Sequence, residues 1–383
     1  MLVACTRDPG DEQTPTLLRE ALARVDDWPA VAEAASRHKM ERILFRRVAD
    51  FCPEAVPADV HDAWRVRSVR IARRSLIMQS ELLKLLAALD AAAVPAVAFK
   101  GPVFSQQLYG VATLRHFSDL DLLVPHAHVA AARVCLLGAG FVDAVELGEV
   151  AHGTLQAGMQ EIVLMHAHTR IPVEIHWREG PRFAAESLSA DMLVERSVPL
   201  ELLGRQIAAL APADVALVIA VHAATHDWQR LEDVAAMAAA LTRLTPAEAA
   251  GLGERAGALR CRRRLHLGVL LAASIADCDV PAPLAAAALA DRTAVDLAAR
   301  AGGRLLRATA ERRPPRAGTP AEAARREIRQ ARALDSPVLT LSYLWRRLFT
   351  PGIHEWSRDE QPKSGPLAAA STFVRRQRRL WER

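Results

Sequence analysis

Apolar positions recur at helical spacing through the first quarter of the chain. Within residues 16–93, side chains such as Ile43, Leu44 and Val48 fall on one face of a helix, and charged residues fill most positions between the apolar ones. A second, longer helix is expected to begin near Ala58. The pattern predicts an all-helical N-terminal region over residues 1–93.

The pattern changes between residues 94 and 210, where short apolar runs rich in β-branched residues alternate with turn residues. Strands are predicted at residues 94–99, 119–124, 141–147, 161–166 and 171–177, with a hairpin turn at 167–170. Short helices are predicted at 102–109 and 127–137. These elements make a small mixed sheet with two helices.

Helical spacing returns after Pro212, in segments dominated by Ala and Leu. Helices are predicted at residues 213–225, 231–244, 246–259, 262–276 and 283–306, followed by a loop at 311–320 and a final helical region that ends in VRRQRRLWER. The expected fold class is therefore α+β, with a mixed-sheet core at 94–210 between helical regions at 1–93 and 211–383.

The composition refines this picture. Hydrophobic residues make up 51% of the chain but aromatic residues only 5%, so Ala, Leu and Val must build a core of closely packed helices. The net charge of +5 is small and spread over helices of mixed sign, and arginine clusters at 260–264 and 375–379 fit solvated helix faces. Nucleic acid is not an expected partner.

Five scattered cysteines, without metal-binding or paired spacing, predict a reduced cytoplasmic setting. No segment is expected to be a signal peptide or to span a bilayer, so the sequence predicts a soluble protein.

Lysine is rare in this chain and arginine is common. Lysine occurs only at positions 39, 84, 100 and 363, and a lysine offers a compact charge where arginine offers a planar fork. We expect this difference to matter at Lys100, whereas chance explains Lys39, Lys84 and Lys363.

Residues 96–125 carry the candidate chemistry. A strand ends at Lys100, Gly101 makes a tight turn, and a helix follows, so backbone N–H groups at its N-terminus favour an anion. Asp119 and Asp121 then share one face of the next strand, roughly 6 to 7 Å apart, and such a pair suits magnesium. The alternative is that both are polar residues on the outer face of an edge strand. The glycine turn before them favours the metal site.

The string F-K-G-x(3)-S-x(2)-L-Y-G at 99–110, followed by L-R-x-x-S-D-L-D-L-L-V-P at 114–125, resembles the uncharacterised nucleotidyltransferase family of the DNA polymerase β-like superfamily. The resemblance continues more weakly in I-P-V-E-I-H-W at 171–177 and V-H-A-A-T-H-D-W-Q-R-L-E-D-V at 221–234.

The resemblance implies a nucleotidyltransferase core and magnesium-dependent transfer of a nucleoside monophosphate from a nucleoside triphosphate such as ATP, with release of pyrophosphate. It also implies a bacterial protein whose acceptor is a peptide, a sugar or another natural-product intermediate. Two metal ions would be held by Asp119, Asp121 and a third carboxylate, for which Glu174 is the first candidate and Glu161 the second. Glu174 would also serve as the base.

The same resemblance implies nucleotide binding by Lys100, Gly101, Arg115 and Ser118. The superfamily usually has Gly-Ser or Gly-Gly at the turn before the acids, whereas this chain has Lys100-Gly101-Pro102. Lys100 is therefore the expected phosphate ligand, and Ser118 is a weaker candidate. Arg115 either neutralises phosphate charge or faces water.

The expected site is a cleft between the core and the C-terminal helices, with one wall near residues 100–121 and the other near 220–235. His222, His226 and Arg230 would line it, and no zinc site is expected because a third ligand is missing. The N-terminal helices would support the far side of the sheet. The competing hypothesis is a non-catalytic module that keeps this fold and binds a nucleotide or a protein.

Overall fold

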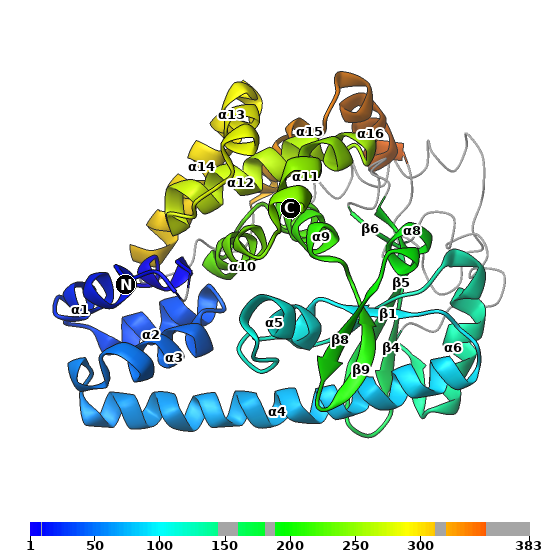
Figure 1. Cartoon of the computed structure of the whole chain (residues 1–383), viewed down its shortest axis with the longest axis horizontal. Coiled ribbons are helices and arrows are strands. Elements are labelled where there is room, and N and C mark those ends of the chain that lie inside the picture. The colour runs from blue at the N-terminus through cyan, green and yellow to red at the C-terminus, as the bar shows by residue number, and fades with distance from the viewer. Residues whose placement is uncertain (9, 145–159, 181–187, 311–318, 350–383) are drawn as a thin grey trace.

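A computed structural model describes residues 1–8, 10–144, 160–180, 188–310 and 319–349 of the chain. Helices surround a small mixed sheet, as predicted (Figure 1). The N-terminal elements are η1 (Ala4–Thr6), α1 (Thr14–Leu22), α2 (Trp28–Arg37), α3 (Glu41–Phe51), η2 (Pro53–Ala55) and α4 (Ala58–Ala91). The long helix α4 passes beneath the N-terminal helices at one end and beneath the sheet at the other.

The sheet has five strands in the order β1-β2-β5-β4-β3. Its elements are β1 (Val97–Phe99), α5 (Gly101–Tyr109), β2 (Leu120–Leu123), η3 (His126–His128), α6 (Val129–Gly138), β3 (Phe141–Asp143), β4 (Glu161–His166) and β5 (Pro172–His176). Strands β2 and β5 are parallel, and the other neighbouring pairs are antiparallel. The five predicted strands are confirmed, although most are shorter than expected. Part of the strand predicted at 141–147 lies outside the described residues.

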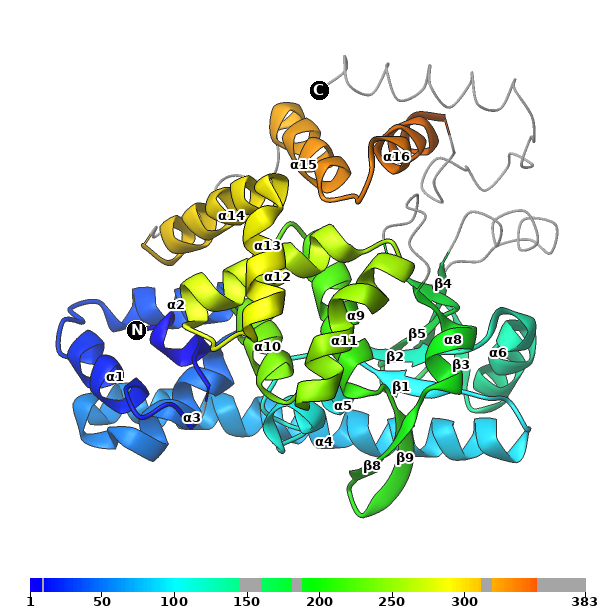
Figure 2. The ribbon, with the colours of Figure 1, turned by 45° about the horizontal axis from the view of Figure 1, so that its top comes forward.

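The two faces of the sheet differ because side chains alternate along each strand. One face is apolar: Leu122 of β2 and Ile175 of β5 belong to the same buried hydrophobic cluster as Leu85 of α4 and Leu136 of α6. The other face carries Asp121 and the polar residues of β5, and helices α9 and α10 lie on this side, away from α4 (Figure 2). The sheet therefore separates a supporting layer from the polar site.

Small elements after β5 were not predicted. They are β6 (Arg178–Glu179), β7 (Leu188–Ser189), α8 (Ala190–Glu195), β8 (Val198–Leu202) and β9 (Arg205–Ala209). Strands β6 and β7 pair with each other, and β8 and β9 form a separate hairpin. A two-residue strand has no periodicity to detect, and β8 alternates only between exposed and half-buried positions over most of its length.

The C-terminal helices form the largest core. They are α9 (Pro212–Thr225), α10 (Leu231–Thr242), α11 (Pro246–Ala258), α12 (Arg262–Ala276), α13 (Ala282–Ala290), α14 (Arg292–Ala310), α15 (Pro320–Arg332) and α16 (Pro337–Phe349). Nearly every residue of α9 and α10 is buried, and alanine supplies many of them, as the composition predicted. At Gly268 of α12, an added Cβ would lie 3.1 Å from the Trp228 ring, so this close packing requires a small residue.

One helix prediction was wrong. The segment predicted as a single helix at 283–306 is two helices, α13 and α14, which are separated at Asp291. The Asp291 carboxylate accepts a hydrogen bond of 3.1 Å from the Ala294 backbone N–H, so it caps the first turn of α14. The predicted loop at 311–320 and the terminal VRRQRRLWER lie mostly or wholly outside the described residues.

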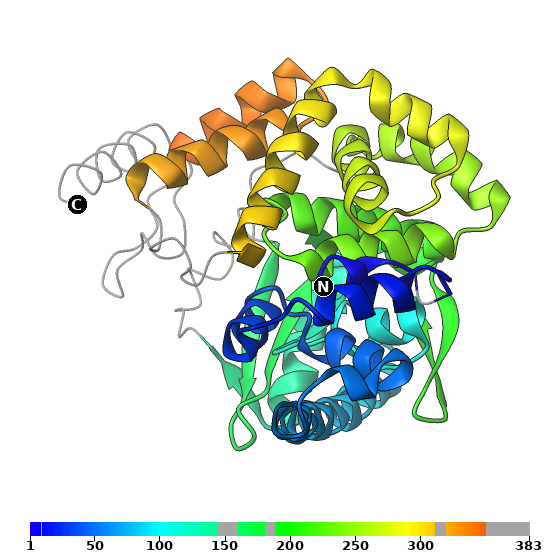
Figure 3. The same cartoon turned by 90° about the vertical axis from the view of Figure 1, so that its left-hand side faces the viewer.

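The expected place of the N-terminal helices was only partly right. The second half of α4 supports the far side of the sheet, but α1, α2 and α3 pack with the C-terminal helices in one shared hydrophobic core. Figure 3 shows them between α4, seen end-on, and the C-terminal helices. The division at residues 93 and 210 remains a prediction.

No helix in the described parts of the chain combines the length and the apolar character needed to cross a membrane.

Candidate active site

The turn between β1 and α5 has an unusual backbone. Lys100 has φ of 52° and Gly101 has φ of 37°, both in the left-handed region that favours glycine. Gly101 then begins α5, with Pro102 in its first turn. The turn thus places the Lys100 side chain beside Asp121 on the polar face of the sheet.

Asp121 and Glu174 are neighbours because β2 and β5 run parallel in register. Asp121 pairs with Glu174, and Leu122 with Ile175, so the acids share one face and the apolar residues the other. Two residues further along β5, His176 lies on the same face as Glu174. The Asp121 side chain is only 5% exposed and that of Glu174 25%.

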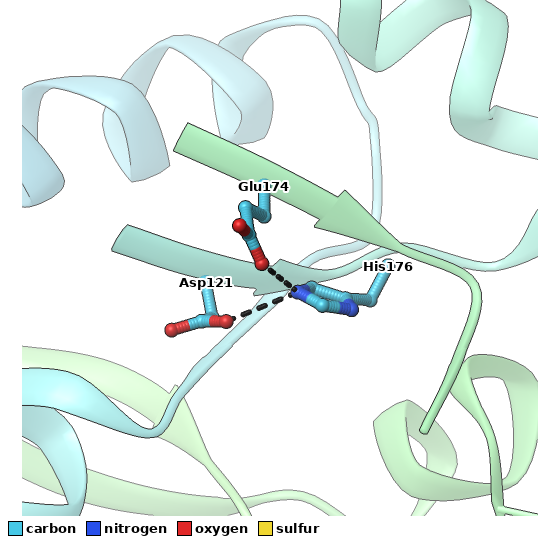
Figure 4. A group of neighbouring side chains, drawn as sticks. All are labelled: Asp121, Glu174 and His176. Atoms are coloured by element: carbon cyan, nitrogen blue, oxygen red, sulfur yellow. Dashed lines mark hydrogen bonds and ion pairs between the residues drawn. The ribbon is translucent and has the colours of Figure 1, made fainter. Parts of the chain in front are cut away.

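The three side chains converge on one point (Figure 4). His176 Nε2 lies 3.0 Å from Asp121 Oδ1 and 3.1 Å from Glu174 Oε2, and one potential ligand atom from each residue lies within 4.8 Å of the others. This spacing fits a single metal ion, and two carboxylates suit a hard divalent cation. The group can hold a metal, although the imidazole nitrogen also admits softer ions than magnesium.

The charges in this cluster compensate one another. Burial alone would raise the pKa of Asp121, but the Lys100 ammonium and the His176 hydrogen bond outweigh it and lower the pKa. Burial and Lys100 alone would lower the pKa of His176, yet hydrogen bonds to three carboxylates raise it well above its usual value. Besides Asp121 and Glu174, the carboxylate of Glu161 contacts His176, with its Oε2 3.1 Å from His176 Nδ1. Because an imidazole nitrogen binds a metal only when it carries no proton, a bound metal ion and a proton would compete for His176 Nε2.

Lys100 is held between two carboxylates. Its Nζ lies 3.3 Å from Asp121 Oδ1 and 3.0 Å from Glu179 Oε2, and Glu179 in turn contacts His222 Nδ1 of α9 at 3.2 Å. Burial alone would lower the pKa of Lys100, but Asp121 and Glu179 outweigh it and raise the pKa. Lys100 thus neutralises the acids and connects the sheet to α9 through Glu179. Its predicted contact with phosphate remains a prediction.

Arg115 is also paired. Its Nε forms an ion pair with Glu232 of α10, and its backbone N–H donates to Ser105 Oγ at 3.0 Å. It therefore does not simply face water, and its charge is largely balanced by Glu232.

Asp119 and Ser118 lie just before β2, which begins at Leu120. Both line the cleft described below, but the one metal-ligand cluster found among the described residues consists of Asp121, Glu174 and His176. The expectation that Asp119 shares the metal with Asp121 remains a prediction.

A cleft with a volume of about 530 Å³ opens over this face of the sheet. Its lining comes from residues 100–121, 160–180 and 218–236. His222, His226 and Arg230 are among the lining residues, so the cleft between the core and the C-terminal helices lies where the sequence predicted it. One contribution was not expected: Lys39 reaches the cleft from the N-terminal helices.

The sequence did not identify His176, Glu179 or Lys39 as residues of this site. His176 had a signal, because the alternation in P-V-E-I-H-W puts it on the same strand face as Glu174. No sequence pattern marked Glu179 or Lys39. Glu179 lies on the two-residue strand β6, and Lys39 follows α2, which is distant in the sequence from the rest of the site.

An acidic cluster on the polar face of a small mixed sheet, beside a glycine turn at a helix N-terminus, is the arrangement expected for nucleotidyl transfer. The family described as "Uncharacterised nucleotidyltransferase" matches residues 25–277, and the chain belongs to this family. Neither a curated protein nor a solved structure matches the chain. The family supports a transferase that acts on nucleotides.

Proposed function

We propose that this protein transfers a nucleoside monophosphate from a nucleoside triphosphate to an acceptor, with magnesium at Asp121 and Glu174. The observation that carries the proposal is the convergence of Asp121, Glu174 and His176 beside the Gly101 turn, inside a cleft of about 530 Å³. A cleft of this size accommodates a nucleotide and part of an acceptor.

In this reaction an acceptor oxygen attacks the α-phosphorus, the bond between the α-phosphorus and the bridging oxygen breaks, and pyrophosphate leaves. Bound magnesium supplies positive charge to the phosphates and orients the reacting oxygens. Asp121 stays ionised because Lys100 and His176 balance its charge. Asp119, at the entrance to β2, would complete the acidic set for a second ion.

Glu174 is the better candidate for the third carboxylate. It lies beside Asp121 in the parallel register, whereas Glu161 contacts the far nitrogen of His176. Glu174 is also more exposed to the cleft than Asp121, which suits a base that takes the acceptor proton. We assign Glu161 the role of orienting the His176 ring.

The nucleotide would bind at the Gly101 turn, where the N-terminus of α5 begins beside Asp119, together with Lys100, Ser118 and Arg115. Walls from α9 and α10 restrict water, which would otherwise compete with the acceptor. We propose a hydroxyl or phosphate group of a peptide, sugar or other natural-product intermediate as acceptor.

The test is incubation of the full chain with each of ATP, GTP, CTP and UTP plus magnesium, with nucleotide affinity, pyrophosphate release and self-labelling as readouts. We expect magnesium-dependent nucleotide binding, and pyrophosphate once an acceptor is present. EDTA should abolish both, and excess magnesium should restore them. Nucleotide affinity that does not depend on magnesium, or the absence of nucleotide binding, would contradict the proposal.

A further inference from the structure

Lys39 occupies a position where glycine is the usual residue. Helix α2 ends at His38 in a Schellman motif: the Met40 N–H donates to the Ala35 carbonyl at 2.8 Å, and the Lys39 N–H donates to the Ser36 carbonyl at 3.1 Å. Lys39 has φ of 56°, the left-handed conformation that this motif requires. Glycine would adopt this conformation with less strain than lysine, so the lysine is not required by the turn.

The same turn forms hydrogen bonds with the start of α10. His38 is fully buried, its Nδ1 accepts a 3.3 Å hydrogen bond from the Leu231 N–H, and its carbonyl accepts one of 3.3 Å from the Glu232 N–H. Arg230, the N-cap residue of α10, supplies no side-chain cap of its own. His38 therefore caps α10 from a distant part of the chain, and this contact brings Lys39 and Arg230 to the same end of the cleft.

These two cations differ from the other cations described above. Lys100 and Arg115 are paired with carboxylates, whereas the side chains of Lys39 and Arg230 form no hydrogen bond or ion pair with any residue that the structure describes. Burial and the nearby Arg230 charge lower the pKa of Lys39, although Glu232 and Asp119 oppose this. Glu232 interacts electrostatically with both cations but forms an ion pair with neither, so both side chains remain able to bind an anionic ligand in the cleft.

We propose that Lys39 and Arg230 bind the outer phosphates of the nucleoside triphosphate, so that the N-terminal helices complete the nucleotide site. The inference rests on the proposed function. Lys39 lies close enough to Asp119 for their charges to interact, and Asp119 directly precedes the strand that carries Asp121. Gly101 lies beside Asp119, so this end of the cleft adjoins the Gly101 turn, where the proposed function places the triphosphate.

The pattern of lysines agrees with this inference. Two of the four lysines in the chain, Lys39 and Lys100, line the cleft, and both have a positive φ. Lys84 provides a contrast, since it is exposed on α4 and pairs with Glu81 at 3.2 Å.

The experiment compares Lys39→Gly, Lys39→Arg and Arg230→Gln with a matched control, Lys84→Met. Dissociation constants are measured with magnesium for each nucleoside triphosphate and for its monophosphate, and melting temperatures are recorded. We expect Lys39→Gly and Arg230→Gln each to weaken triphosphate binding about tenfold, as for the loss of one charged contact, while monophosphate binding stays unchanged.

The variants also separate binding from folding. Lys39→Gly relaxes the backbone, so its melting temperature should equal or exceed that of the wild type, and Lys39→Arg should retain most of the triphosphate affinity. Lys84→Met should behave as the wild type. Equal triphosphate affinity in the wild type, Lys39→Gly and Arg230→Gln would overturn this inference alone, whereas a wild type that binds no triphosphate would overturn it together with the proposed function.

Discussion

His176 Nε2 and Asp121 Oδ1 lie 3.0 Å apart, and this contact joins two strands that are distant in the sequence. It places the imidazole ring against an acid whose other neighbour is Lys100. The acid is therefore both a candidate metal ligand and part of a buried charge network, and substitutions at these positions should separate the two roles.

Asp121→Asn should abolish transfer and also destabilise the fold. The residue is buried, and Asn removes the charge that balances Lys100 and His176, so we expect a loss of roughly 3 kcal/mol in the free energy of unfolding. Glu174→Gln should also abolish transfer, but the free energy of unfolding should fall much less, because the Glu174 side chain is 25% exposed. Urea unfolding and pyrophosphate release would be measured on both. Equal free energies of unfolding for the two variants would contradict the claim that the buried Asp121 stabilises the fold more than Glu174 does.

Asp119→Asn should abolish transfer and leave stability unchanged. Asp119 lines the cleft at the entrance to β2, and the metal-ligand cluster of the described residues does not include it. Activity assays and thermal unfolding provide the measurements. Turnover near the wild-type rate would remove Asp119 from the proposed metal site.

His176→Asn should weaken metal binding by about 10- to 100-fold, the usual effect of losing a ligand or its close partner. Titration of the full chain with Mn²⁺, followed by paramagnetic resonance, measures this affinity directly. Glu161→Gln should reduce the Mn²⁺ affinity less, since Glu161 contacts only Nδ1 of His176, the ring nitrogen that faces away from the metal cluster. Unchanged Mn²⁺ affinity in His176→Asn would show that the histidine serves the fold alone.

Glu179→Gln should lower stability in a pH-dependent way. Burial alone would raise the pKa of Glu179, but Lys100 and His222 outweigh it and hold the pKa well below the ordinary value of 4.5. A depressed pKa stabilises the folded state above the unfolded pKa, and this contribution is lost as the pH falls through the folded pKa. The free energy of unfolding of the wild type should therefore exceed that of Glu179→Gln by roughly 3 kcal/mol at pH 7. The difference should shrink below about pH 4.5 in urea unfolding.

Local patterns were enough to predict the sheet, most helices and the position of the cleft. Asp121 and Glu174 each lie on a strand whose alternation shows which face is polar. The break at Asp291 was missed because alanine-rich segments keep their helical spacing across it. Lys39 was missed for a different reason: its place in the cleft depends on a hydrogen bond between His38 and Leu231, and no local pattern encodes such a contact.

That hydrogen bond spans 193 positions in the sequence, which has a consequence for the order of folding. The N-terminal helices leave the ribosome first, yet their apolar faces share a core with helices that are synthesised much later. Contacts of such long range form slowly, and exposed apolar surface invites aggregation in the meantime. The wall of the cleft that carries Lys39 can therefore be completed only after α10 has been made, although α2 is synthesised well before it.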